Sequence, residues 1–231
     1  MRYSLTFALL GALICYWAVS QGGWWYLLFW LAISFFTLST GYIGVGSRIF
    51  CKKPDGTIPI WVKTIHFPFL LYAEIVWYVT QALSRENPFD KVHKDLIIGR
   101  RLRANELPPG ILNYVDLTAE FEDPQEIRHS TNYISLPILD ASVPSSEGLI
   151  WAISRLRAGT TYVHCAQGHG RTGLFALAFL LIRGNVETYE DGFSLLKEVR
   201  QGIGLNKTQK TFVKKLIAEQ QDQADEDKAR R

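Results

Sequence analysis

Two long stretches without a charged side chain stand at the N-terminal end of the sequence and constrain the fold more than any other feature. Residues 4–20 and residues 24–46 contain no Asp, Glu, Lys or Arg, and only a Gln-Gly-Gly turn separates them. A helix needs roughly 17–25 residues to cross the hydrocarbon core of a bilayer. Basic residues precede the first stretch at Arg2 and follow the second at Arg48. We therefore expect residues 1–50 to form a tight transmembrane hairpin with both ends in the cytoplasm.

A cleaved signal peptide is the alternative interpretation of the first stretch. Signal peptides have a shorter apolar centre, more N-terminal charge and a cleavage site made of small residues. The second apolar stretch follows at once and ends at a group of basic residues, which looks like a membrane stop and favours the hairpin.

Residues 51–83 are expected to form a turn-rich linker and then an amphipathic helix at the membrane surface. Many aromatic side chains occur here, together with Lys63, His66 and Glu74. A third membrane span would bury these ionisable groups at a total cost of about several kcal/mol. It would also move the C-terminal domain out of the cytoplasm, where a reactive thiol is harder to keep reduced. The interfacial helix is therefore favoured.

The remaining sequence has the composition of a soluble domain. Residues 84–231 carry equal numbers of basic and acidic side chains, so the net charge of +3 lies in the apolar N-terminal part. This balance does not indicate nucleic-acid binding, which needs clustered basic charge on the folded domain. Cys15, Cys51 and Cys165 lie far apart, so neither a disulfide framework nor a metal-ligand spacing is visible. Cys51, next to basic residues, is either an inert thiol or a site of acylation.

Strand and helix patterns alternate along residues 84–220, and this alternation predicts an α/β domain with a central sheet flanked by helices. Residues 221–231 form a charged tail. The expected strands are 95–100, 111–118, 131–139 and 160–165, and the expected helices are 145–158, 173–184, 189–200 and 208–220.

The segment VHCAQGHGRTG (163–173) carries the chemistry that the sequence predicts. A strand pattern leads into a glycine-rich loop, and a helix pattern follows it. Backbone N–H groups in such a loop make a concave anion site, which the positive end of the helix dipole strengthens. Gly168 and Gly170 allow the required backbone conformations and a close approach to phosphoryl oxygens. Arg171 can grip two of those oxygens, and these positive groups favour the thiolate of Cys165.

Two neighbours complete this segment. Thr172 can donate a hydrogen bond to the sulfur of Cys165 and ease its departure from a phospho-enzyme. His164 precedes the nucleophile and either tunes the loop or has a structural role.

This segment resembles the signature of the dual-specificity subgroup of the protein tyrosine phosphatase superfamily: His-Cys, five residues, then Arg followed by Ser or Thr. The matching positions are His164, Cys165, Gly168, Gly170, Arg171 and Thr172. The resemblance runs from about residue 89 to residue 220. It implies a tyrosine-phosphatase-like fold and hydrolysis of phosphate monoesters through a phosphocysteine. The phosphate loop would then consist of Ala166, Gln167, Gly168, His169, Gly170 and Arg171.

A proton donor for the leaving group is expected on the loop after residues 131–139. In the family the general acid lies on such a loop upstream of the nucleophile, and here the loop carries Asp140. Asp116 and Glu120 are the rival candidates. Gln209 is placed where some relatives have a glutamine that orients the hydrolytic water, or it is a solvated surface residue.

The loop composition bears on the substrate. Gln167 and His169 occupy positions where relatives that act on multiply phosphorylated lipids often have lysines, so a single phosphomonoester is favoured. The anchor makes a phospholipid monoester such as phosphatidylglycerophosphate a candidate, and a phosphotyrosine or phosphoserine protein is equally open. The sequence implies no cofactor or metal, and it leaves the oligomeric state open. The alternatives from other classes are a catalytically weak membrane-tethered module that binds phosphorylated partners or lipids, and a purely structural membrane protein.

Overall fold

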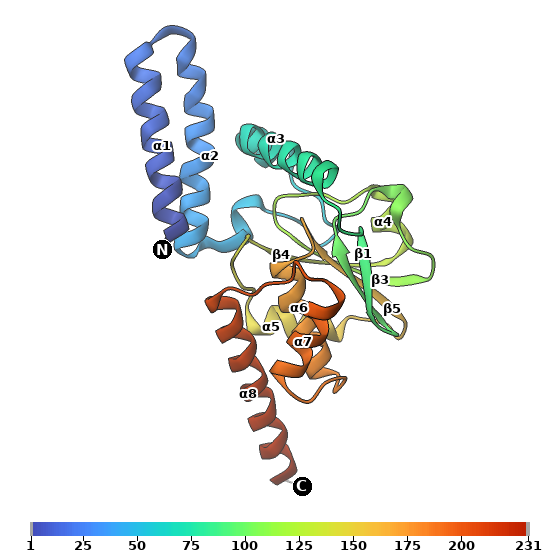
Figure 1. Ribbon diagram of the computed structural model, residues 1–231. Coiled ribbons are helices and arrows are strands. Elements are labelled where there is room, and N and C mark those ends of the chain that lie inside the picture. Colours follow the sequence, from blue (N-terminus) through green and yellow to red (C-terminus); the bar gives the residue numbers. More distant parts are fainter. Residues whose placement is uncertain (1, 230–231) are drawn as a thin grey trace. The chain divides into compact units, whose positions relative to one another are not determined.

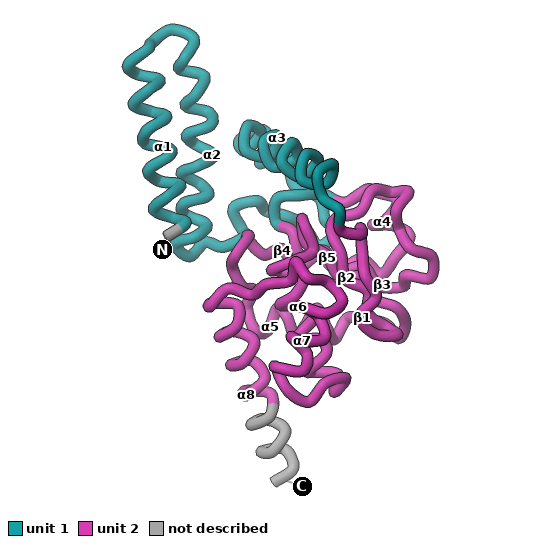
Figure 2. The backbone as a smooth tube through the Cα atoms, viewed as in Figure 1, with its two compact units in different colours: residues 1–85, 119–122 teal, residues 86–118, 123–231 magenta. Residues whose placement is uncertain are grey.

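The computed structural model describes residues 2–229, with side chains for residues 3–220. It divides into two compact units, which Figures 1 and 2 show in ribbon and tube form. Unit 1 comprises residues 1–85 and 119–122, and unit 2 comprises residues 86–118 and 123–231. The sequence did not predict that the short segment 119–122 would belong by its contacts to the N-terminal unit.

A helical hairpin forms the first part of unit 1 (Figure 1). The two helical arms are long and apolar enough to cross a membrane by length and composition, over Tyr3–Gln21 and Gly23–Phe50. A hydrogen bond of 3.0 Å between the hydroxyls of Ser4 and Ser39 lies buried between the arms. The first arm is α1 (Arg2–Gln21), and the second consists of η1 (Gly23–Leu27), α2 (Leu28–Thr40), η2 (Gly41–Val45) and η3 (Gly46–Phe50).

The helix α3 (Ile60–Leu83) completes unit 1 and packs against α2. Pro68 lies inside it and has no N–H to donate, so the carbonyl of Thr64, one turn earlier, loses its helical partner. The indole N–H of Trp30 donates to that carbonyl at 2.8 Å. The hydroxyl of Ser34 donates to the next carbonyl, that of Ile65, at 3.1 Å. Polar groups of α2 therefore compensate for the proline.

A five-stranded sheet forms the centre of unit 2, in the order β1-β2-β5-β3-β4. β1 is antiparallel to β2, and the other neighbours are parallel. The strand predicted at 95–100 corresponds to β2, and the structure adds an antiparallel strand, β1, before it. The strands are β1 (Phe89–His93), β2 (Leu96–Arg100), β3 (Ile111–Thr118), β4 (Asn132–Ile138) and β5 (Thr160–Cys165).

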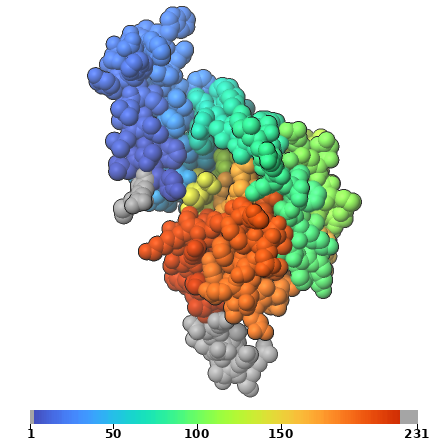
Figure 3. Space-filling model, in the orientation of Figure 1, coloured from blue at the N-terminus to red at the C-terminus, as the bar shows by residue number. Residues whose placement is uncertain are grey.

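Helices cover both faces of this sheet, as the predicted α/β architecture requires. Successive strand residues point to opposite faces. Val163, for example, packs into the larger core with the C-terminal helices, and Tyr162 packs into the smaller core on the other face. The residues of the C-terminal part coloured orange to red form one continuous surface in Figure 3. The helices are η4 (Ala104–Glu106), α4 (Gln125–Ser130), α5 (Ser146–Ser154), α6 (Gly170–Ile182), α7 (Tyr189–Val199) and α8 (Lys207–Ala229).

The helix α6 lies at the centre of the larger core. Leu174, Phe175, Leu177 and Leu180 on it are completely buried, and burying each such side chain contributes about 1.5–3 kcal/mol to folding. The helix begins at Gly170, three residues earlier than the hydrophobic pattern predicted. Its first turn therefore includes the polar end of the glycine-rich loop, which places backbone N–H groups at the carboxyl end of β5.

Candidate active site

Cys165 is the last residue of β5, and the glycine-rich loop follows it directly. The four parallel strands end at the same edge of the sheet, where open α/β sheets bind their ligands. Cys165 is only 4% exposed. Its surroundings therefore decide whether the thiol ionises.

Positive and hydrogen-bonding groups lower the pKa of the Cys165 thiol below its ordinary value. Burial alone would raise this pKa, but the guanidinium of Arg171 and the hydroxyl of Thr172 favour the thiolate. The backbone N–H groups of His169 and Thr172 add to the effect. The Thr172 hydroxyl is buried and has no nitrogen or oxygen partner, which leaves it to the sulfur. This arrangement favours the thiolate, which is the nucleophilic form of a cysteine.

The carbonyl groups of the loop are held from outside. The N–H of Arg101 donates to the Ala166 carbonyl at 3.3 Å. The guanidinium of Arg200 donates to the carbonyls of Gln167 and Gly168, each at 3.1 Å. In a trans peptide the N–H points away from the preceding C=O. The N–H groups of residues 167–169 therefore turn to the opposite side, which is the geometry of an anion-binding nest.

Arg200 is the buried centre of this support. It is 3% exposed and reaches the loop from the end of α7. Its guanidinium also binds the carboxylates of Asp90 at 2.7 Å and Glu86 at 3.0 Å. The same Glu86 carboxylate pairs with the imidazole Nε2 of His169 at 2.7 Å. The only titratable side chain of the loop besides the thiol and Arg171 is therefore already engaged.

The two glycines of the loop differ in what they require. Gly168 has φ of +76°, and a Cβ there would lie 2.4 Å from the carbonyl of Gly99, which is backbone and cannot move away cheaply. At Gly170 a Cβ would meet the side chain of Gln209 at 3.6 Å, an ordinary contact. Of these two positions, only position 168 therefore requires a glycine for its backbone conformation and close contact. The sequence had predicted such a requirement at both positions.

Replacing Arg200 by Lys is expected to lower kcat/KM for phosphate monoesters by about 10²-fold, because one ammonium group cannot hold two carbonyls and two carboxylates at once. Steady-state kinetics measures the loss. The exposed Arg155→Lys variant, at the end of α5, is the matched control and should behave as the native protein does. An Arg200→Lys protein with native kinetics would show that the loop keeps its shape without this support.

Arg171 connects the loop with the candidate acid. It is 2% exposed, and one of its nitrogens donates to the carbonyl of Ile138, the last residue of β4, at 2.9 Å. Another nitrogen lies 3.4 Å from a carboxylate oxygen of Asp140. The Asp140 side chain is 78% exposed. The sequence-predicted residues Cys165, Arg171 and Asp140 thus meet at one edge of the sheet.

The turn before α8 holds the loop that carries Asp140. The amide of Asn206 donates to the carbonyl of Ala141 at 2.8 Å, and the amide of Gln209 donates to the carbonyl of Ser142 at 3.2 Å. Ala141 has φ of +56°, an unusual value for a residue with a side chain. Gln209 is 2% exposed, so the solvated surface position considered from the sequence is wrong.

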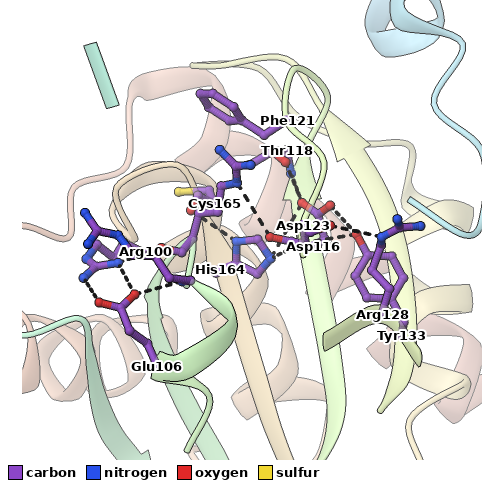
Figure 4. A network of polar contacts seen from close by, with 12 residues as sticks. Arg100, Glu106, Asp116, Thr118, Phe121, Asp123, Arg128, Tyr133, His164 and Cys165 are labelled. Carbon is purple, nitrogen blue, oxygen red and sulfur yellow. Dashed lines mark hydrogen bonds and ion pairs between the residues drawn. The ribbon is translucent and has the colours of Figure 1, made fainter. Parts of the chain in front are cut away.

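A buried polar network lies behind Cys165 (Figure 4). Nε2 of His164 faces the carboxylate of Asp123 at 3.1 Å and that of Asp116 at 3.7 Å. Burial opposes a charge on His164, but Asp123, Asp116 and Cys165 together favour it, so the pKa of His164 is raised. The hydroxyl of Tyr133 donates to Asp116 at 2.5 Å and to Asp123 at 3.2 Å. These contacts favour the protonated form of the imidazole next to Cys165.

The rival acid candidates have other partners. Asp116 is completely buried and accepts hydrogen bonds from the N–H and the hydroxyl of Thr118. Glu120 accepts a hydrogen bond from the N–H of Ala119 at 3.0 Å and belongs to unit 1. Asp116 is therefore closed to a leaving alcohol, whereas Glu120 is half-buried.

Among the described residues, Asp116, Asp123 and His164 bring three possible metal-ligand atoms within 4.8 Å of one another. Their hydrogen bonds to Thr118, Tyr133 and each other use most of the lone pairs that a metal would need. The cluster is therefore explained as a hydrogen-bonded ion pair.

The supporting residues Arg200, Asp123 and Asn206 were not predicted from the sequence. Arg200 lies 32 residues after the carbonyl of Gly168 that it binds, and Asp123 lies 41 residues before its partner His164. A lone arginine at the end of an amphipathic helix and an Asp-Pro turn carry no local signal of such contacts. Only the folded topology brings them to the loop.

Comparison with curated proteins found two viral relatives. The chain is 31% identical over 130 residues to the putative tyrosine phosphatase 067L of Invertebrate iridescent virus 3, which covers 47% of this chain and 54% of that protein. It is 33% identical over 89 residues to the putative tyrosine phosphatase 197R of Invertebrate iridescent virus 6, covering 33% of this chain and 34% of that protein. The chain thus spans about half the length of the first relative and a third of the second. No family model matches it.

Solved structures share the fold of unit 2. PTPMT1 in complex with PI(5)P superimposes with a TM-score of 0.54 at 16% identity, covering 60% of this chain and 99% of that chain. Human DUSP28 superimposes with a TM-score of 0.53 at 16% identity, covering 59% and 97%. The predicted fold class is thereby confirmed. The chain is thus similar in sequence to two putative tyrosine phosphatases over part of its length, and it shares the fold of PTPMT1 and DUSP28.

Proposed function

We propose that the chain is a membrane-anchored phosphoric monoester hydrolase that works through a phosphocysteine at Cys165. The observation that carries the proposal is the Cys165 thiol, whose pKa is lowered although it is buried. Cys165 is the last residue of β5, and its thiol lies next to backbone N–H groups of the loop and the guanidinium of Arg171. A buried thiol without function has no need for such surroundings.

The first step forms the covalent intermediate. The thiolate of Cys165 attacks phosphorus, so that an S–P bond forms while the bond from phosphorus to the leaving oxygen breaks. Asp140 gives its proton to that oxygen, which departs as an alcohol or phenol. The N–H groups of the loop and the fork of Arg171 hold the phosphoryl oxygens during transfer.

The second step releases phosphate. Water attacks phosphorus and gives a proton to Asp140 as the S–P bond breaks. The sulfur departs as a thiolate, which the Thr172 hydroxyl stabilises. Gln209 is engaged with Ser142 and Asn206, so its part in this step is to hold the loop that carries Asp140.

The Asp140→Asn variant is expected to lose about 10²- to 10⁴-fold in kcat on alkyl phosphates, whose leaving oxygen needs a proton. Its loss on nitrophenyl phosphate should be far smaller, because that oxygen departs as a stable anion. Phosphate release on both substrates measures the difference, and Glu187→Gln, on an exposed turn, is the control. Unchanged rates on alkyl phosphate would remove Asp140 from the role of general acid.

A phospholipid with one phosphomonoester, such as phosphatidylglycerophosphate, is the substrate class that we favour. The loop offers one guanidinium, that of Arg171, for a phosphate group, and its histidine, His169, is paired with Glu86. Two apolar helical arms suit a protein whose substrate lies in the bilayer. PTPMT1, which shares the fold, has been crystallised with PI(5)P. A phosphoprotein is the second candidate substrate. It is supported by the two viral relatives, which are named as putative tyrosine phosphatases.

Phosphate release by the full-length protein, with phosphatidylglycerophosphate in liposomes beside a phosphotyrosyl peptide, distinguishes the two substrates. The lipid proposal predicts the higher kcat/KM on liposomes. A higher value on the peptide would assign the protein to phosphoprotein turnover. Binding of a phosphate analogue without turnover of either substrate would point instead to a module that only captures phosphorylated groups.

We further propose that residues 1–50 lie in the membrane and that the phosphatase unit faces the cytoplasm. The basic residues that flank the hairpin support this orientation under the positive-inside rule. The exposed apolar side chains of α3, among them Trp61, Leu71 and Tyr72, suit a helix at the membrane surface. Protease digestion of sealed vesicles measures the orientation, and protection of unit 2 in cytoplasm-outward vesicles would contradict it.

A further inference from the structure

The segment 119–122 lies between β3 and α4 in the sequence, yet the linker after the membrane hairpin holds it. The ammonium of Lys52 donates to the carbonyl of Phe121 at 2.5 Å. One carboxylate oxygen of Glu122 accepts from the N–H of Ile58, and the other accepts from the ammonium of Lys63 at 2.8 Å. Glu122 thus binds both the linker backbone and the first turn of α3.

The next residue, Asp123, is the partner of His164. It is 4% exposed, and the guanidinium of Arg128 donates to its carbonyl at 3.0 Å. Its carboxylate lies 3.1 Å from Nε2 of His164. Consecutive Cα atoms are only about 3.8 Å apart. A fixed Glu122 therefore limits where the Asp123 side chain can lie.

His164 is completely buried, so only protein groups decide its charge. The titratable groups that face it come from three strands and one loop: Asp116 and Tyr114 on β3, Tyr133 on β4 through its bonds to both carboxylates, Tyr162 and Cys165 on β5, and Asp123. Asp123 makes the closest contact with the imidazole among them. The imidazolium and the thiolate of Cys165 stabilise each other, and such coupling is reciprocal.

We propose that Glu122 is a positioning residue for the phosphatase reaction. By binding Ile58 and Lys63 it fixes Asp123 beside His164, and it thereby maintains the positive charge behind Cys165. The linker that directly follows the membrane hairpin thus takes part in setting the reactivity of the nucleophile. This inference rests on the proposed function, in which Cys165 acts as a thiolate.

The test is the pH dependence of Cys165 alkylation by iodoacetamide, a neutral reagent, in the full-length protein in detergent micelles. Alkylation follows the thiolate and needs no phosphatase activity. In Glu122→Gln and in Lys63→Met the pH midpoint of Cys165 alkylation should move upward by about 0.5–1 pH unit. A displaced Asp123 leaves His164 less charged, and a less charged His164 stabilises the thiolate less. The double variant should shift no further than either single one, because both break the same contact.

Two comparisons make the outcome decisive. Glu126→Gln, four residues away and exposed, is the matched control and should keep the native midpoint. Asp123→Asn removes the carboxylate itself and should shift the midpoint at least as far. A Glu122→Gln protein with a lower Tm but the native midpoint would reduce Glu122 to a structural role and overturn the inference. A native midpoint at the ordinary cysteine value would instead contradict the proposed function.

Discussion

Replacement of Cys165 by Ser is expected to abolish phosphate release, with a loss in kcat of roughly 10⁴- to 10⁶-fold. A hydroxyl oxygen in the same place stays protonated, because the surroundings that favour a thiolate are too weak to ionise an alcohol. The N–H groups and Arg171 remain, so the variant should bind inorganic phosphate with near-native affinity. Phosphate release and isothermal titration measure the two properties separately.

The exposed Cys51→Ser variant is the control for the Cys165 experiment and should keep native activity. Substantial turnover by Cys165→Ser would remove the covalent mechanism. Loss of phosphate binding along with turnover would show that the sulfur itself shapes the loop, contrary to an arrangement in which Arg101 and Arg200 hold it from outside.

The second large effect is expected at Arg171. In Arg171→Lys the charge remains, but the planar fork that can grip two phosphoryl oxygens is lost, and so is the donor to the Ile138 carbonyl. We expect kcat/KM to fall by about 10³- to 10⁵-fold, the range known for arginines that stabilise phosphoryl transfer. Steady-state kinetics on one phosphate monoester checks the prediction.

Arg171→Met tests whether the remaining charge matters. It should raise the pH midpoint of Cys165 alkylation, because the guanidinium favours the thiolate, whereas Arg171→Lys should leave that midpoint near the native value. Nearly native kinetics of Arg171→Lys would mean that a point charge suffices and that the fork does not hold the transferred group.

The local part of the site could be predicted from the sequence because its elements are contiguous. Strand, loop and helix follow one another within residues 160–182, and their residue types define the anion site without reference to the rest of the chain. Asp140 could be placed on the acid loop through the family resemblance, and the structure puts its carboxylate 3.4 Å from Arg171. The general-acid role of Asp140 stays a prediction.

The supporting contacts could not be predicted, because they join residues that are distant in the sequence. Arg200 binds the carboxylate of Asp90 across 110 positions, and Glu122 binds the N–H of Ile58 across 64. Their residue types suit any exposed turn or helix end. The strand β1 was missed for a different reason: the turn that joins it to β2 is short, and β1 is too polar to show an apolar alternation.

The most direct test of the account is to trap the intermediate. Full-length protein is mixed with a phosphate monoester, quenched in acid within the first turnover, digested and examined by mass spectrometry. The account predicts one phosphoryl group on the peptide that contains Cys165, and none in the Cys165→Ser variant. Product release in the first turnover with the phosphoryl group on another residue, or on none, would contradict it.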